Sequence, residues 1–95
     1  MKPRISDIVH FVLPKHILSE ARQHRAGQHR PAIVVAINEG WTLHLQVFTD
    51  GSTDGIGKDA NRNLYWATSI AEDQTGIQEN TWHWPEPAEL TPIDS

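Results

Sequence analysis

The segment Thr81–Pro87, with the sequence Thr-Trp-His-Trp-Pro-Glu-Pro, constrains the fold of this chain more than any other. Successive side chains of an extended strand point to opposite faces, so Trp82 and Trp84 share one face and His83 takes the other. Proline has no backbone N–H to give to a neighbouring strand, so regular pairing ends at or before Pro85. The segment therefore predicts a short final edge strand that carries a large apolar surface.

Four earlier segments also have the composition or the alternation of β-strands, namely residues 5–13, 31–37, 41–49 and 64–71. Neither face of the first is fully polar, which predicts a strand that is central or covered on both sides. In the third, the face predicted to point into the core holds Trp41, Leu43, Leu45 and Val47. Phe48 falls on the opposite face of that strand, and we expect it to lie under the following loop.

The segments between these strands predict the connections and the extent of the domain. Residues 16–25 are expected to form a short helix or an ordered loop that Gly27 ends, and Asn38–Gly40 reads as a hairpin turn. Five short strands in fewer than a hundred residues predict a mainly β fold, an SH3-like barrel first and an OB-like barrel second. We expect one domain over residues 1–87 and an irregular C-terminal tail over 88–95.

Composition and charge narrow the classes of partner. The chain has no cysteine, which excludes disulfides, thiolate metal sites and a cysteine nucleophile. No apolar run has the length of a transmembrane helix or a secretory signal, so we expect no membrane partner. Residues 1–30 hold six basic residues against two acids, whereas residues 31–95 hold two against ten. The acidic remainder argues against a nucleic-acid partner, while the basic segment suits a phosphate-bearing ligand.

The chain offers little for catalysis or for a cofactor, and we expect no enzyme, no cofactor and no metal. Its serines lie outside the Gly-x-Ser-x-Gly context of a nucleophile. Residues 50–61 begin like a calcium-binding EF-hand loop, but the loop has Asn61 where a bidentate glutamate belongs, so we interpret it as an ordinary polar connection. His16, His24 and His29 lack the i, i+4 spacing of a helical metal pair.

Tryptophan and arginine residues are better candidates for a binding site, and tryptophan is frequent here, at four of the 95 residues. Indole faces stack on bases, and arginines hold phosphates through forked hydrogen bonds. Small barrels also bury tryptophan, so we assign Trp41 and one of Trp82 and Trp84 to the core. Tyr65 and Trp66 alternate, which leaves one of them for a binding or subunit contact. The predicted ligand-binding residues are Arg22, Arg25, Arg30, Trp66, Trp84 and His83.

Several segments resemble a family of small, mostly uncharacterised proteins encoded by tailed phages and prophages. They are Ile8-Val-His-Phe-Val-Leu-Pro14, Arg30-Pro-Ala-Ile-Val-Val35, Leu45-Gln-Val-Phe-Thr-Asp-Gly51, Trp66-Ala-Thr-Ser69 and Thr81-Trp-His-Trp-Pro-Glu86. The resemblance spans most of residues 5–87 and implies a viral origin and a place in the host cytoplasm, but no catalytic residues.

Together with the aromatic and basic residues, the resemblance suggests a non-enzymatic, homo-oligomeric module that sequesters a nucleotide-like signal of host defence. Two alternatives stay open: a decoration or connector protein of the virion, and a protein inhibitor of a host defence factor.

Overall fold

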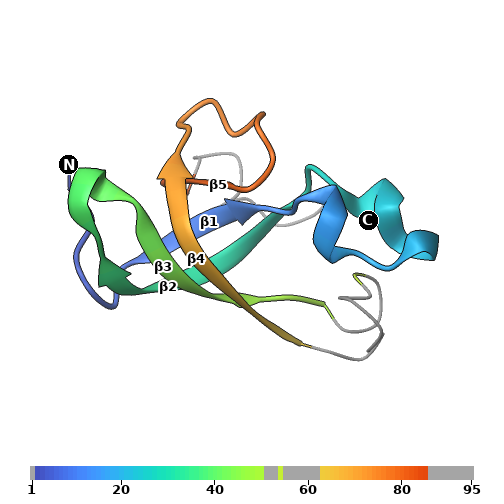
Figure 1. The fold of residues 1–95 in the computed structure, drawn as a ribbon, viewed down its shortest axis with the longest axis horizontal. Coiled ribbons are helices and arrows are strands. Elements are labelled where there is room, and N and C mark those ends of the chain that lie inside the picture. The colour runs from blue at the N-terminus through green and yellow to red at the C-terminus, as the bar shows by residue number, and fades with distance from the viewer. Residues whose placement is uncertain (1, 51–53, 55–62, 86–95) are drawn as a thin grey trace.

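The structure, a computed structural model, describes residues 2–50, 54 and 63–85, and five strands form a closed barrel within them (Figure 1). The strands are β1 (Ile8–Val12), β2 (His29–Ile37), β3 (Leu43–Phe48), β4 (Leu64–Glu72) and β5 (Thr81–His83). Neighbours along the chain pair antiparallel except β4 and β5, which run parallel, and β1 pairs with β5 to close the barrel. The predicted mainly β, five-stranded small barrel is confirmed.

The core fills the inside of this barrel with alternate side chains from every strand. On β3 the inward residues Leu43, Leu45 and Val47 are fully buried, as their alternation predicts. The largest buried side chain is Trp82 of β5, which is 1% exposed. Its burial confirms that one of Trp82 and Trp84 belongs to the core, and Trp84 packs partly buried against the same core. β1 has a neighbour on each side and is therefore central, one of the two expected arrangements; Val12 on its outer face is buried, whereas Ile8 on that face is 48% exposed.

The assignment of Trp41 to the core is wrong. Trp41 ends the 3-10 helix η3 (Glu39–Trp41) and is 41% exposed, with the Lys2 Nζ atom 4.6 Å from the centre of its ring. Gly40 and Trp41 both have positive φ angles, of 75° and 62°. This left-handed backbone interrupts the alternation, so that β3 begins at Leu43 rather than at Trp41. Phe48 points away from the core as expected, but at 41% exposed it is not covered.

The prediction that the last strand lies at an edge is also wrong. β5 pairs with β1 at His10–His83 and Phe11–Trp82, and with β4 at Ala71–Thr81 and Glu72–Trp82. Proline does prevent a longer ladder, since β5 ends at His83, but Pro85 lies beyond the last pair and does not oppose closure. The alternation of a strand shows its two faces, and it does not show how many neighbours the strand has.

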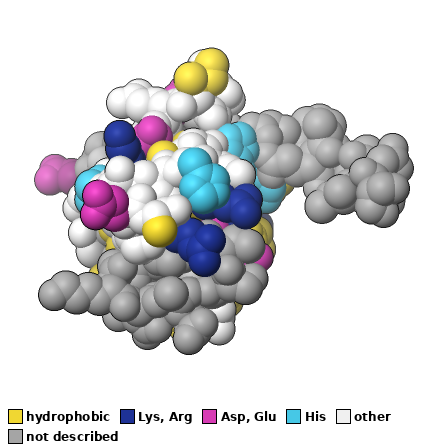
Figure 2. Space-filling model, turned by 90° about the vertical axis from the view of Figure 1, so that its right-hand side faces the viewer, with side chains coloured by type: hydrophobic (Ala, Val, Ile, Leu, Met, Phe, Trp, Pro, Cys, Tyr) yellow, Lys and Arg dark blue, Asp and Glu magenta, His cyan; other side chains and the backbone are white. Residues whose placement is uncertain are grey.

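Residues 15–25 form two 3-10 helices, η1 (Lys15–Ile17) and η2 (Glu20–Arg25), in place of one α-helix. Ile17 and Leu18 are buried and attach this segment to one end of the barrel. The face that this end of the molecule presents carries basic and histidine side chains with acidic ones among them (Figure 2). Within η1 and η2 these side chains are Lys15, His16, Arg22, His24 and Arg25.

Two predictions fall on residues that the structure does not describe. The calcium-like loop over 50–61 lies outside the described residues apart from Asp50 and Asp54, and so does the tail over 88–95. In the part of the chain that is described, no helix is long and apolar enough to cross a membrane.

Candidate functional site: three histidines on the barrel wall

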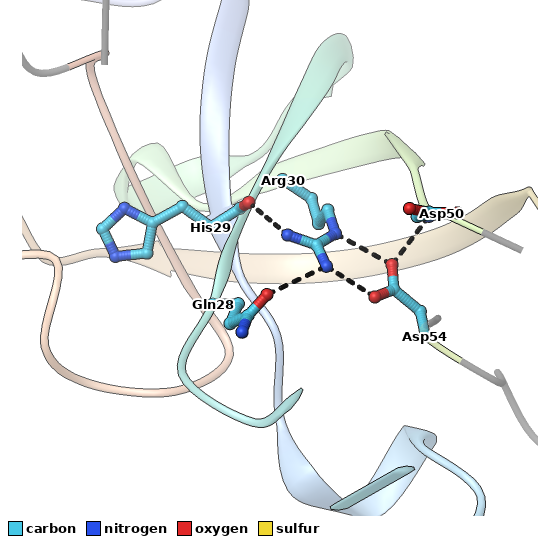
Figure 3. Close-up of polar contacts among 5 residues, drawn as sticks. All are labelled: Gln28, His29, Arg30, Asp50 and Asp54. Carbon is cyan, nitrogen blue, oxygen red and sulfur yellow. Dashed lines mark hydrogen bonds and ion pairs between the residues drawn. The ribbon is translucent and has the colours of Figure 1, made fainter. Parts of the chain in front are cut away.

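Arg30, one of the predicted phosphate ligands, is held by a carboxylate instead. Its Nε and Nη2 atoms donate to the two Asp54 carboxylate oxygens at 2.8 and 2.5 Å (Figure 3). The Asp50 amide donates to the same carboxylate at 2.7 Å, and Asp54 is fully buried. Burial alone would raise the pKa of Asp54, but the hydrogen bonds from Arg30 and from the Asp50 amide outweigh it, so the pKa lies below its ordinary 3.8. The guanidinium therefore has a structural partner.

The other predicted residues lie in separate surroundings. Arg22 and Arg25 belong to η2, at the end of the barrel. Trp66 is 49% exposed on the outer wall of β4, with its ring centre 5.9 Å from that of His44 on β3. Trp84 packs edge-on against Trp82, their ring centres 5.6 Å apart. The expectation that one of Tyr65 and Trp66 is exposed is confirmed, with Trp66 outside, but the contacts of these residues do not join them into one pocket.

His83 lies among histidines from two other strands. His10 of β1, His29 of β2 and His83 of β5 each offer a ring nitrogen, and these three atoms lie within 4.8 Å of one another. The ring centres of His29 and His83 are 4.5 Å apart, and those of His10 and His83 are 5.7 Å apart. We call these three residues the histidine cluster. It is the group of possible metal ligands that the described residues contain.

Strand register explains why the three side chains meet. Phe11 and Trp82 pair with each other and point into the core, so their neighbours His10 and His83, which also pair, point outward. His29 pairs with Val12, two residues from His10, and so lies on the same outer face. Figure 3 shows the alternation on β2 directly, because the His29 ring and the Arg30 guanidinium leave the strand in opposite directions.

The connection between β4 and β5, which we call the cover, contacts the histidine cluster at His29, whose Nε2 lies 2.9 Å from the Gly76 carbonyl oxygen. This segment, residues 73–80, arches beside β5 in Figure 1. The Asn80 amide donates to the Val12 carbonyl at 2.9 Å, and the Asp73 amide donates to the Trp82 carbonyl at 2.9 Å. His83 is fully buried, whereas His10 and His29 are half-buried. The cluster therefore combines one fully buried histidine with two half-buried ones.

The cover has its own internal order. Asp73 accepts hydrogen bonds from the Thr75 hydroxyl at 2.6 Å and from the Gln78 amide at 3.0 Å. These bonds, that of the Thr75 hydroxyl first, lower the pKa of Asp73 below its ordinary 3.8. The Lys15 amide donates to Glu79 at 2.8 Å, which attaches the cover to η1. The segment is thus held in place over the histidines by bonds at both of its ends.

One histidine is already oriented in the way that metal ligands are. His29 Nε2 lies 2.9 Å from the Gly76 carbonyl oxygen, which only accepts, so Nε2 carries a hydrogen and donates it. Metal-binding histidines commonly donate their second ring N–H to a backbone carbonyl, which settles the tautomer and the ring orientation. Zn–N bonds of about 2.0–2.1 Å place the ligand atoms of a tetrahedral ion about 3.3 Å apart. The ring nitrogens of the cluster, which lie within 4.8 Å of one another, would therefore move by about 1 Å each to bind the ion.

Reasoning from the sequence missed this group because it compared histidines along the chain. His29 was considered with His16 and His24, which are both exposed on the 15–25 segment. The strand alternation does indicate that His10 and His83 point away from the core, because each is next to a core residue, Phe11 or Trp82. The group becomes a site only when the first and last strands are placed side by side.

Comparisons with protein-family models, with curated proteins and with solved structures found no match for this chain. The resemblance to phage proteins therefore stays a prediction from the quoted segments, and the function is argued from the site alone.

Proposed function

We propose that this chain is a non-enzymatic binding module whose ligand is a divalent transition-metal ion, with Zn²⁺ as the reference case. The observation that carries the proposal is the convergence of His10, His29 and His83, from three strands, to within 4.8 Å at their ring nitrogens. The proposal keeps the binding role expected from the sequence and replaces the ligand.

The donor set selects the class of ion. Neutral imidazole nitrogen suits Zn²⁺, Cu²⁺ and Ni²⁺, whereas Ca²⁺ and Mg²⁺ take oxygen ligands. The histidine cluster supplies nitrogen only, and a chain without cysteine has no thiolate to recruit softer ions. Three protein ligands leave room for a further donor in a four-coordinate ion.

The nucleotide-like ligand expected from the sequence has less support. It needs cationic groups beside an exposed indole, but Arg30 is bonded to Asp54, and Trp66 contacts His44. His83, expected to donate to that ligand, is fully buried among the other two histidines. A metal ion can bind through the same buried histidine, His83, and needs neither an arginine nor an exposed indole beside it.

The experiment is calorimetric titration of the chelator-treated protein with Zn²⁺. We expect one ion per chain, and we expect His10→Asn to weaken binding by more than about 100-fold, since loss of even an outer-shell partner costs 10–100-fold. The matched control is His24→Asn, which removes an exposed histidine outside the cluster and leaves binding unchanged.

Zn²⁺ binding that His24→Asn abolishes and His10→Asn does not would overturn the proposal, as would no Zn²⁺ binding at micromolar protein. Two further titrations are informative. Binding of Ca²⁺ but not Zn²⁺ would point to an oxygen site such as the 50–61 loop and would also overturn it. Heat from ADP-ribose or cyclic nucleotides in a protein that ignores Zn²⁺ would restore the nucleotide ligand in its place.

A further inference from the structure

We infer that an ion held by the histidine cluster stabilises the closed form of the barrel, because it would tie β5 to β1 and β2. The inference rests on the metal-binding function proposed above and adds what that binding controls. It follows from where the three ligands lie in the sheet.

β5 is the least secured strand of the barrel. It has three residues and pairs over two positions with β1 and two with β4, and the β4 pairing is parallel. β2, by comparison, pairs over five positions with β1 and five with β3. Because short ladders open with a lower free energy than long ones, β5 is where the closed barrel opens most readily.

Each histidine brings a different strand to the ion. His83 is the last residue of β5, His10 is its pairing partner on β1, and His29 comes from the far side of β1, on β2. An ion bound to all three adds bonds across the β1–β5 ladder and across the neighbouring β1–β2 ladder. His83 also follows Trp82 directly, so fixing His83 fixes the largest buried side chain of the core.

The cover takes part in the same closure. His29 Nε2 donates to Gly76 in the middle of residues 73–80, and the Asp73 amide donates to the Trp82 carbonyl. An ion bound to His29 therefore fixes the ring that holds the cover, and release of β5 breaks the Asp73 bond. β5, the cover and the ion form one cooperative unit. The long strands β2, β3 and β4 pair with one another without this unit.

The experiment measures amide hydrogen exchange of the full chain with and without Zn²⁺ at about 100 times its dissociation constant. Any opening that releases the ion becomes rarer by about the same factor, so exchange in peptides covering residues 73–85 is expected to slow by about 100-fold. The internal control is β3, residues 43–48, which contributes no histidine to the cluster and pairs with residues 32–37 of β2 and with β4. We expect its exchange to change much less.

The outcomes separate the two proposals. If Zn²⁺ binds but amide exchange at residues 73–85 is unchanged, the inference that the ion stabilises the closed barrel is overturned, while the proposed metal-binding function stands. Equal slowing at 73–85 and at β3 also overturns it, because β5 would then open only with the whole barrel. No Zn²⁺ binding overturns both. His10→Asn provides the second check because it removes a half-buried ligand and keeps the fully buried His83: we expect the variant to fold, and we expect Zn²⁺ at the same concentration to leave its 73–85 exchange fast.

Discussion

The Arg30–Asp54 pair offers a direct test of whether Arg30 serves the fold or a ligand. We predict that Asp54→Asn destabilises the protein strongly, although asparagine has nearly the same shape. The substitution removes the charge that faces the guanidinium and weakens both forked hydrogen bonds, which measure 2.8 and 2.5 Å. It also weakens the bond from the Asp50 amide, at 2.7 Å.

The magnitude follows from burial. Removing one partner of a buried ion pair costs about 3–5 kcal/mol, because the other charge is left without compensation. The Asp54 side chain is fully buried, but that of Arg30 is 17% exposed, so water can partly solvate the guanidinium in the variant. Arg30 also keeps its bond to the His29 carbonyl at 2.9 Å. We therefore expect about 2–3 kcal/mol, which lowers the Tm of a domain of this size by about 10–20 °C.

The assay is urea unfolding of the wild type, Asp54→Asn, Arg30→Met and the double variant. If the two side chains act as a pair, the double variant costs less than the sum of the single ones, by about 1–3 kcal/mol. Additive costs, or an Asp54→Asn variant as stable as the wild type, would refute the assignment of Arg30 to the fold. Arg30 would then be available to the phosphate ligand expected from the sequence.

The same pair sets a pH dependence with a definite sign. The pKa of Asp54 is lowered in the folded protein, so its stabilisation is fully present above the ordinary value of 3.8 and is lost as pH falls through the lower folded-state pKa. The difference in stability between the wild type and Asp54→Asn should therefore be constant from pH 7 to about pH 5 and shrink in more acid solution.

Two further substitutions test the packing and the cover. Trp82→Ala should cost about 3–5 kcal/mol in urea unfolding because the indole is 1% exposed, whereas Trp66→Ala, at a half-exposed position on the outer wall, should cost less than about 1 kcal/mol; equal costs would contradict the assigned core. Asp73→Ala should speed amide exchange at Thr75 and Gln78, whose N–H groups bond to its carboxylate, and an unchanged exchange rate there would show that the cover is held by other contacts.

The alternation of apolar residues determined a large part of this fold. Leu43, Leu45 and Val47 are buried as expected, because the period of a strand places every second side chain on the same face. Trp82 is buried and Trp66 is exposed for the same reason. Trp41 does not follow the alternation because the positive φ angles at Gly40 and Trp41 interrupt the strand. A periodic pattern of apolar residues carries no information about residues with left-handed backbone.

The candidate site shows the opposite case. His10, His29 and His83 are far apart in the sequence, and each one alone is an ordinary strand histidine. Only the pairing of β1 with both β2 and β5 brings them together, and that pairing depends on closure of the whole barrel. Arg30 likewise gained its partner from a residue beyond β3. Local periodicity therefore determined which face each side chain takes, whereas the neighbours on that face were decided by long-range strand pairing, which no local pattern in the chain encodes.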